Sequence, residues 1–408
     1  MISAGEASGD MHAANVIDAL VAHTSTTSTS DIQFFGMGGQ RLAGCGMEVL
    51  VDVDNHAVMG LLEVLHKYPS LRANLSTLRK ALSERKPDVL LLVDYPHFNM
   101  KLAATAKSLG IPVVYFIAPK VWASRPGRLT ELSKLVDHIA LILPFEKKIF
   151  DDASIPCTYV GNPLLDNLKL KNAAKESHDK DHKVKRIALL PGSRKSEVSM
   201  LLPPMLQSCV QLTGDQQSAD QPSDDQPSDD QLRGTPDDWE FLLPVAETID
   251  REYIQKITSE HQLNLKLIQS DDYDALASCD AALVASGTAT LELAILGVPM
   301  VVIYKLKPLS YKVIKRWLTI EHISLVNIIA EKRVVPELLQ DDVTAEKLSL
   351  ELNELLTNPD ARQQQLTQLA AVYRELGDAG ASDKTAQLLH SIVGKSSNNS
   401  DLKGVACT

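Results

Sequence analysis

The sequence lacks most of the features that identify a membrane, secreted or zinc-binding protein. None of its apolar runs approaches the roughly 20 residues of a membrane-spanning helix, and its first residues do not form the charged and apolar segments of a secretory leader. Its five cysteines are scattered without a CxxC pair, which predicts neither a zinc site nor a disulfide framework. This cysteine pattern favours a reducing, cytoplasmic compartment.

Positive charge is also scarce. The 408 residues include 41 lysines and arginines against 52 aspartates and glutamates, so the formal net charge is -11. Nucleic-acid binding needs a dominant basic surface, so we expect no such partner. Neither GxxxxGKS, GxxxxGKT nor a GxGxxG after a strand occurs. An anionic ligand would therefore have to be held by other local groups.

Apolar runs alternate with helical patterns along the chain. Continuous apolar runs of this kind predict parallel sheets that are covered on both faces, and the length suffices for two or three domains. The sequence therefore predicts an α/β protein with two doubly wound, Rossmann-like domains facing a cleft. The runs expected to be strands are 32–38, 88–94, 111–119, 137–144, 186–193, 239–246, 263–269, 280–287 and 299–304.

Composition also suggests where the domains begin and end. An acidic insertion with the near-repeat DQPSDDQPSDDQ and a polar tail are too hydrophilic to bury, so we expect both to be disordered. The C-terminal helices could cross back to the first domain. The expected divisions are an N-terminal domain at 1–168, a linker at 169–184, a C-terminal domain at 185–360 with the insertion at 214–236, C-terminal helices at 361–395 and the tail at 396–408.

The first strand is expected to be truncated. Only Ile2, Ser3 and Ala4 precede the turn GEASGD, whereas strands usually have about five or six residues. Either the true start lies upstream or the chain is a truncated product. Loss of a central strand would expose sheet edges and leave Glu6 without support, so the activity of the chain as written is left open.

Two loops of the second half predict an anion site. In LLPGSRKSE, a glycine allows close backbone approach, and Ser193 and Arg194 can donate to phosphate oxygens. At 286–288 a strand ends and a helix begins, so free N–H groups favour an anion. Glu292 is out of capping-box register and could hold two ribose hydroxyls. The alternatives are a solvated arginine and a glutamate that only favours the helix N-terminus. The residues expected at this site are Gly192, Ser193, Arg194, Ser286, Gly287, Thr288 and Glu292.

The first half offers candidates for acid-base chemistry. Asp94, in DYPHFN, follows an apolar run, and a carboxylate at the end of a parallel strand is well placed to act as a general base. Alternatively, Asp94 caps the following helix. Glu6, Asp10 and His12 form a competing acid-base group. Three residues of another loop could bind a ring, a sugar or a phosphate, or could merely pack: Trp122, Arg125 and Arg128.

Two basic and apolar segments could lie on a membrane surface. They are HAVMGLLEVLHKYPSLR at 56–72 and YKLKPLSYKVIKRWLTI at 304–320. Each segment alone is equally compatible with an amphipathic core helix, but their occurrence in an acidic protein predicts loose association with anionic bilayers. The residues expected to face acyl chains are Met59, Leu61, Leu62, Leu65 and Trp317.

A set of motifs resembles one protein family over most of the chain. The motifs are GEASGD, AVMGLLEVL, VDYPHFN, PKVWAS, LPFEKKIF, YVGNPLLD, LLPGSRKSEV, ASGTATLELA and SLVNIIA. In this combination and order they resemble the lipid-A-disaccharide synthase family. The resemblance implies a GT-B fold and a hexosyltransferase that joins UDP-2,3-diacylglucosamine to 2,3-diacylglucosamine 1-phosphate. The products would be a β(1→6) disaccharide 1-phosphate and UDP, formed at the cytoplasmic face of the inner membrane of Gram-negative bacteria.

The resemblance also implies residue roles. Asp94 would accept the proton of the acceptor 6-hydroxyl, and Glu6 would lie near the sugar. Arg194 and Asn327 would hold donor or UDP oxygens, and Glu292 the ribose. The leaving phosphate needs cationic and N–H donors, which Arg194 and the 286–288 turn would supply without a metal. We therefore expect no metal or cofactor, and inversion by direct displacement.

Two other functions remain open from the residues. A UDP-sugar 2-epimerase would share the nucleotide helix, although it would not need VDYPHFN or apolar surface. An inactive nucleotide-sugar-binding scaffold gains support only from the short first strand. The sequence leaves open the acyl-chain length, the oligomeric state and which acid is the base.

Overall fold

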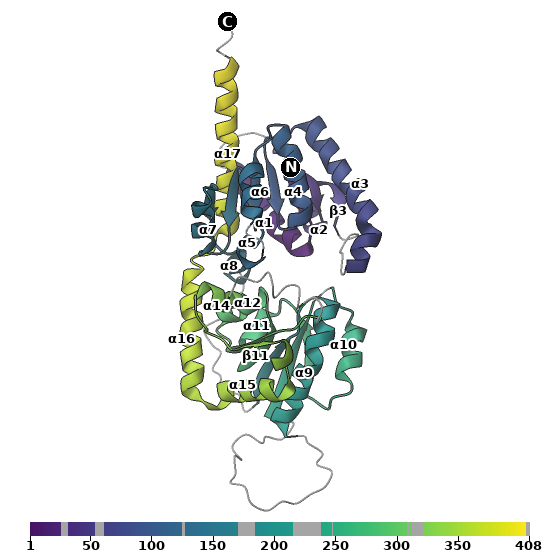
Figure 1. The fold of residues 1–408 in the computed structure, drawn as a ribbon, viewed down its shortest axis with the longest axis vertical. Coiled ribbons are helices and arrows are strands. Elements are labelled where there is room, and N and C mark those ends of the chain that lie inside the picture. Colours follow the sequence, from purple (N-terminus) through teal and green to yellow (C-terminus); the bar gives the residue numbers. More distant parts are fainter. Residues whose placement is uncertain are drawn as a thin grey trace, which may run out of the picture. The chain divides into compact units, whose positions relative to one another are not determined.

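The computed structural model forms two compact units (Figure 1). Unit 1 comprises Met1–Asn167 and Leu376–Thr408, and unit 2 comprises Leu168–Glu375. The structure describes residues 1–25, 32–53, 61–124, 127–169, 184–214, 238–246, 248–307, 311 and 321–404, without the side chains of 24–25, 61–68, 123–124, 167–169 and 395–404. The expected linker and acidic insertion lie outside these residues, apart from Lys169, Val184 and Gly214.

Unit 1 contains a sheet of seven parallel strands in the order β3-β2-β1-β4-β5-β6-β7. Its strands are β1 (Ile2–Ala4), β2 (Phe35–Gly38), β3 (Glu48–Asp52), β4 (Leu90–Val93), β5 (Val113–Phe116), β6 (His138–Leu141) and β7 (Cys157–Tyr159). Its helices are α1 (Ala7–Ser25), α2 (Gln40–Gly44), α3 (Leu61–Arg85), α4 (Pro96–Ser108), α5 (Val121–Ser124), α6 (Arg128–Leu135), α7 (Glu146–Asp152), α8 (Pro163–Lys169) and α17 (Ala381–Gly404).

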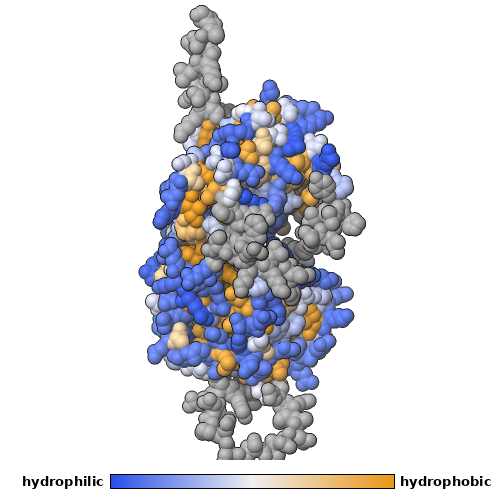
Figure 2. Space-filling view, in the orientation of Figure 1, coloured by the Kyte–Doolittle hydropathy of each residue, from blue (hydrophilic) through white to orange (hydrophobic). Residues whose placement is uncertain are grey.

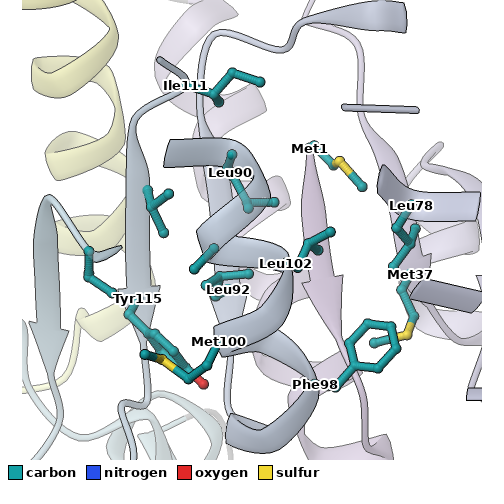
Figure 3. Close-up of a cluster of buried hydrophobic side chains, with 14 of the residues drawn as sticks. Met1, Met37, Leu78, Leu90, Leu92, Phe98, Met100, Leu102, Ile111 and Tyr115 are labelled. Carbon is teal, nitrogen blue, oxygen red and sulfur yellow. The ribbon is translucent and has the colours of Figure 1, made fainter. Parts of the chain in front are cut away.

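Both faces of this sheet are buried, which explains the continuous apolar runs. Along β4, Leu90 and Leu92 enter one core, whereas Leu91 and Val93 enter the core on the opposite face. Figure 3 shows part of the first core, where Leu90 and Leu92 lie close to Leu102 of α4. The alternation places every side chain of β4 in an apolar environment.

The short strand β1 is central. It pairs with β2 on one side and with β4 on the other. Gly36 of β2 has φ +148°, and a Cβ there would lie 1.9 Å from the carbonyl oxygen of Ile2, so the close approach of the two strands requires glycine. The amino group of Met1 donates to the carbonyl oxygen of Val89 at 2.9 Å.

Unit 2 contains six parallel strands in the order β10-β9-β8-β11-β12-β13. Its strands are β8 (Lys185–Leu190), β9 (Trp239–Val245), β10 (Leu265–Gln269), β11 (Ala281–Ala285), β12 (Met300–Tyr304) and β13 (Glu337–Leu339). Its helices are α9 (Lys195–Thr213), α10 (Arg251–Thr258), α11 (Tyr273–Ala277), α12 (Ala289–Leu296), α14 (Leu325–Ile329), α15 (Ala345–Thr357) and α16 (Pro359–Glu375), with a short 3-10 helix at Gln340–Asp342.

Each run expected to be a strand contains one, and the α/β class with two parallel sheets is confirmed. Three further strands were not expected, and all three lie at sheet edges: β3, β7 and β13. Each of these strands buries only part of its surface, and β7 and β13 have only 3 residues each, so they carry a weak apolar signal. On the drawn face of the molecule, hydrophilic residues predominate and apolar residues form scattered groups (Figure 2).

The C-terminal region differs in part from the expectation. After α16 of unit 2, the chain enters unit 1 and forms α17, whose first N–H groups, from Gly380 to Ser382, donate to the carboxylate of Asp166. The helix continues to Gly404, whereas the sequence predicts disorder from residue 396. Adding a residue to an existing helix costs less than nucleating one, so a polar sequence can extend a helix that is already packed.

Candidate active site

The switch point of the unit 1 sheet lies between β1 and β4. The chain leaves these neighbouring strands toward opposite edges of the sheet, and ligands of doubly wound sheets bind at the carboxyl ends of strands at such a point. The register pairs Ala4 with Val93, which places the loops carrying Glu6 and Asp94 side by side. A Cβ on Gly5 would lie 2.1 Å from the ring of Tyr95, so the glycine allows these loops to touch.

The backbone at Asp94 is strained and firmly held. Asp94 and Tyr95 have φ of 47° and 49°, in the left-handed region that few residues other than glycine adopt. The carbonyl oxygen of Asp94 accepts hydrogen bonds at 2.7 Å from both Asn99 Nδ2 and Tyr115 Oη. Asn99 is fully buried and also exchanges hydrogen bonds with Ser3 of β1. Because the N-cap position of α4 belongs to Tyr95, the structure does not support the capping alternative for Asp94.

The competing acid-base group is not assembled at this edge. The Asp10 carboxylate is 4% exposed and accepts N–H bonds from Gly39 and Arg41 at the start of α2, so it has a structural role. Burial lowers the pKa of His12 to about 4, which keeps its imidazole neutral at pH 7. Arg128 begins α6 and contacts the ring of His97. Arg125 lies outside the described residues.

The switch point of the unit 2 sheet lies between β8 and β11, where the register pairs Leu190 with Val284. Gly192 follows β8 with φ +105°, and a Cβ there would lie 2.4 Å from Glu197 Oε2. Arg194 is the N-cap residue of α9, which begins at Lys195. Its guanidinium donates to Glu197 Oε1 at 3.0 Å and its side chain is 63% exposed. The arginine is thus oriented by one carboxylate while most of its surface is accessible.

The second loop of this edge begins α12. The hydroxyl of Ser286 donates to the carbonyl oxygen of Ile323 at 3.0 Å, so this side chain is bound within the unit, although its oxygen can still accept a hydrogen bond. Thr288 is the N-cap residue of α12 and makes no side-chain cap bond. Burial raises the pKa of Glu292 on α12 to about 7, so this carboxyl group changes its ionisation state near neutral pH. Ser193 lies in the first loop, where its carbonyl oxygen accepts a bond from Thr248.

Asn327 has a structural position that differs from the expected one. It is fully buried on α14, its Oδ1 accepts from the backbone N–H groups of Val334 and Val335, and its Nδ2 donates to Glu337 Oε1. The amide therefore has no capacity left for donor or UDP oxygens. It fixes the loop after α14, and we do not carry it forward as a ligand contact.

The residues expected to face acyl chains all lie outside the described side chains. Met59 and Trp317 lie outside the described residues, and Leu61, Leu62 and Leu65 lie on α3, where the structure gives the backbone only. In the described part of the chain, no group of three or more histidine, cysteine or acidic side chains is arranged to hold a metal ion. No helix among the described residues combines the length and apolarity needed to cross a bilayer.

Comparisons with known proteins agree over nearly the whole chain. A family model described as lipid-A-disaccharide synthetase matches residues 1–221 and 228–392, and the gap between these ranges falls inside the acidic insertion. The curated lipid-A-disaccharide synthase of Syntrophus aciditrophicus (strain SB) is 39% identical over 400 residues, which cover 97% of this chain and 98% of that protein.

Solved structures of low sequence identity share the fold. The UDP-GlcNAc 2-epimerase of Neisseria meningitidis bound to UDP-GlcNAc has a TM-score of 0.61 at 16% identity, covering 96% of this chain and 98% of that one. The calicheamicin glycosyltransferase CalG4 has a TM-score of 0.55 at 13% identity, covering 94% and 95%. At these identities the likeness shows the GT-B arrangement of two Rossmann-like domains, and it does not discriminate between an epimerase and a transferase.

Proposed function

Because the chain belongs to the lipid-A-disaccharide synthetase family, we propose that it is an inverting hexosyltransferase that joins UDP-2,3-diacylglucosamine to 2,3-diacylglucosamine 1-phosphate. The observation that carries this proposal is the match to curated synthases over 97% of the chain. The epimerase alternative rests on fold likeness alone. A scaffold without activity would not need a carboxylate on strained backbone, such as Asp94, at the switch point of the unit 1 sheet.

We assign the acceptor chemistry to unit 1. Asp94 takes the proton of the acceptor 6-hydroxyl as that oxygen attacks the anomeric carbon of the donor, and Glu6 lies near the sugar. The left-handed backbone fixes the Cα–Cβ direction of Asp94, and the bonds from Asn99 and Tyr115 hold that backbone. A positioned base of this kind typically accelerates a reaction by about 10²–10⁴-fold.

We assign the leaving group to unit 2. As the anomeric bond breaks, the β-phosphate of UDP gains negative charge, which Arg194 and the N–H groups of Gly287 and Thr288 stabilise. The N–H of Ser286 does not take part, because it donates to the carbonyl oxygen of Ile303 at 2.9 Å. Gly192 and Ser193 bring backbone close to the diphosphate, and Glu292 accepts hydrogen bonds from the ribose hydroxyls. The chemistry needs no metal in this scheme because the guanidinium and the helix N-terminus supply the compensating charge.

The experiment that tests this function is direct. The purified chain is incubated with both lipid substrates, and UDP release and disaccharide formation are followed together by chromatography and mass spectrometry. We expect one disaccharide 1-phosphate per UDP and no UDP release without the acceptor. Epimerisation of UDP-GlcNAc with no disaccharide formed would replace this proposal by the epimerase.

The substrates carry acyl chains, so we also propose that the protein works loosely bound to the cytoplasmic face of the inner membrane. The expected basic and apolar segments at 56–72 and 304–320 support this, because such sequences favour anionic interfaces. We expect co-sedimentation with vesicles of phosphatidylglycerol and phosphatidylethanolamine, and less with pure phosphatidylcholine. Retention in the supernatant with every composition would contradict it.

A further inference from the structure

Unit 1 buries a carboxyl group that the proposed reaction does not use. Glu146 begins α7, directly after β6 and its turn, and is 3% exposed. Its Oε1 accepts a hydrogen bond from Trp122 Nε1 at 3.0 Å, and its Oε2 accepts one from the backbone N–H of Leu143 at 3.3 Å. An acid with so little access to water is costly to ionise unless donors compensate its charge, and these two hydrogen bonds supply part of that compensation.

The partners of Glu146 connect it to the loop of Asp94. The strands β4, β5 and β6 are neighbours, so the loops after them lie along one carboxyl edge of the sheet. Asp94 follows β4, Lys120 and Trp122 follow β5, and Glu146 follows β6. The indole of Trp122 also packs edge-on against Phe145, with ring centroids 5.0 Å apart and planes at 78°. The hydrogen bond and the ring contact together fix the orientation of Trp122.

Glu146 can change its ionisation state near neutral pH. Burial raises its pKa to about 7, against the bonds from Trp122 and Leu143 and the charge of Lys120, which act in the opposite direction. Desolvation lowers the pKa of Lys120, while Glu146 and Asp94 both counter this effect. Lys120 itself is exposed, so water screens the effect of its charge on both carboxylates. Burial raises the pKa of Tyr159 on β7 to about 12, and the charge of Glu146 acts in the same direction, so this phenol stays neutral.

We propose that Glu146 is a positioning residue, whose carboxylate holds the indole of Trp122 at the sheet edge that carries Asp94, in an orientation that receives the acceptor sugar. This inference rests on the proposed transferase function. Ionised Glu146 accepts a charge-assisted hydrogen bond from the indole of Trp122. Protonation of Glu146 removes this charge assistance and weakens the bond, so the indole is held less firmly.

The first test needs no turnover. The chain contains three tryptophans, so the fluorescence of the full-length protein is titrated between pH 5.5 and 8.5 together with Glu146→Gln and Trp122→Phe. We expect a step near pH 7 in the wild type that is absent from both variants. Glu146→Gln keeps an oxygen that can accept from the indole while it removes the titration. A step that persists in Glu146→Gln would overturn the proposal.

The second test separates acceptor from donor. In Glu146→Gln at pH 8 we expect kcat/KM for the acceptor to fall about tenfold, while UDP affinity measured by calorimetry is unchanged. The wild type should lose acceptor kcat/KM between pH 8 and pH 6, and the variant should stay at the low value throughout. The matched control is Glu131→Gln, at an exposed carboxylate of α6 in the same unit, which should follow the wild type.

These outcomes separate the two proposals. If the wild type makes no disaccharide but shows the fluorescence step, the transferase assignment fails and the contact between Glu146 and Trp122 stands. If the wild type makes disaccharide and Glu146→Gln matches it at every pH, the transferase assignment stands and the role of Glu146 is refuted. An equal loss in acceptor and UDP binding would also refute it, because that pattern indicates a general structural defect.

Discussion

The two switch points share a topology but are built from different residues. In unit 1, the loops after β4 and β5 hold three residues other than glycine at positive φ, namely Asp94, Tyr95 and Ile117. In unit 2, the loop after β8 turns at a glycine, Gly192. A left-handed residue with a side chain costs about 1–2 kcal/mol, whereas glycine adopts that conformation without this penalty.

The difference indicates what each edge presents to a ligand. The strain in unit 1 persists because buried donors, Asn99 and Tyr115, hold the carbonyl oxygen of Asp94, and the result is a fixed Cα–Cβ direction at Asp94. In unit 2, the loop after β8 turns at Gly192, and this turn brings backbone N–H groups and the side chain of Arg194 to the surface. One edge therefore suits proton transfer and the other suits an anion.

Removing the carboxylate of unit 1 should have the largest effect. Asparagine tolerates the left-handed region, so Asp94→Asn keeps the backbone and removes the base. We expect turnover to fall by about 10²–10⁴-fold with the melting temperature nearly unchanged. Disaccharide formation and thermal unfolding are the measurements.

The matched control is Asp88→Asn, at an exposed position just before the amino end of the same strand. It should retain wild-type turnover. Asp94→Asn activity within a factor of three of the wild type would remove Asp94 from its assigned role and leave Glu6 as the candidate base.

Adding a methyl group at Gly192 should have the second-largest effect, and this effect concerns the carboxyl edge of the unit 2 sheet. Alanine there is strained at φ +105° and forces the Glu197 carboxylate away, which releases its hold on Arg194. We expect Gly192→Ala to lose about 1–2 kcal/mol of stability and to weaken UDP binding about tenfold. Calorimetry with UDP and denaturant unfolding measure the two effects.

Gly287→Ala is the stability control, because a Cβ there meets no atom within 4 Å and its φ is not positive. Only Gly192→Ala should be destabilised. Equal stability of the two variants would show that the loop after β8 does not depend on glycine, and the contrast between the two edges would lose its basis.

The sequence predicted the sheets better than the details of the site. Strands such as β4 and β11 are buried on both faces, so their apolar runs are unmistakable, while the edge strands β3, β7 and β13 gave no such signal. The edge positions of Asp94 and Arg194 followed from the rule that loops at carboxyl ends carry the chemistry.

Long-range contacts decided what the sequence could not. Asn327 was expected to bind the donor, but its partners at residues 334–337 become visible only once β13 is placed beside β12. Asn99 binds Ser3, 96 residues away, and Glu146 binds Trp122 across two loops. No local pattern encodes such pairs, although VDYPHFN and LPFEKKIF contain one member of each.

UDP binding at the carboxyl edge of the unit 2 sheet should depend on pH through Glu292. Burial raises the pKa of Glu292 to about 7, and ribose hydroxyls donate to its ionised form, so UDP affinity should fall about tenfold between pH 8 and pH 6. The stability of the free protein should depend on pH in the opposite direction, falling as the pH rises. Because the folded pKa lies above the unfolded value of 4.5, the contribution of Glu292 to stability is lost as the pH rises from 4.5 to 7.

Glu292→Gln should bind UDP more weakly at pH 8 and with little pH dependence. Calorimetry at four pH values measures this. A wild-type affinity that stays flat from pH 8 to pH 6 would exclude the ribose role for Glu292 and support the alternative that the residue only favours the helix N-terminus.

The smallest expected effect tests the strain in unit 1 itself. Ile117 is β-branched, has φ +58° and packs against the core around β1. Both Ile117→Ala and Ile117→Gly remove that packing, but only glycine relieves the backbone. In most positions alanine is the more stable residue, because glycine gains more entropy on unfolding. Here we expect Ile117→Gly to be the more stable of the two by about 0.5–1 kcal/mol in denaturant unfolding. A more stable alanine variant would mean that the loop after β5 relaxes to negative φ without cost, and the strained edge would then be confined to Asp94 and Tyr95.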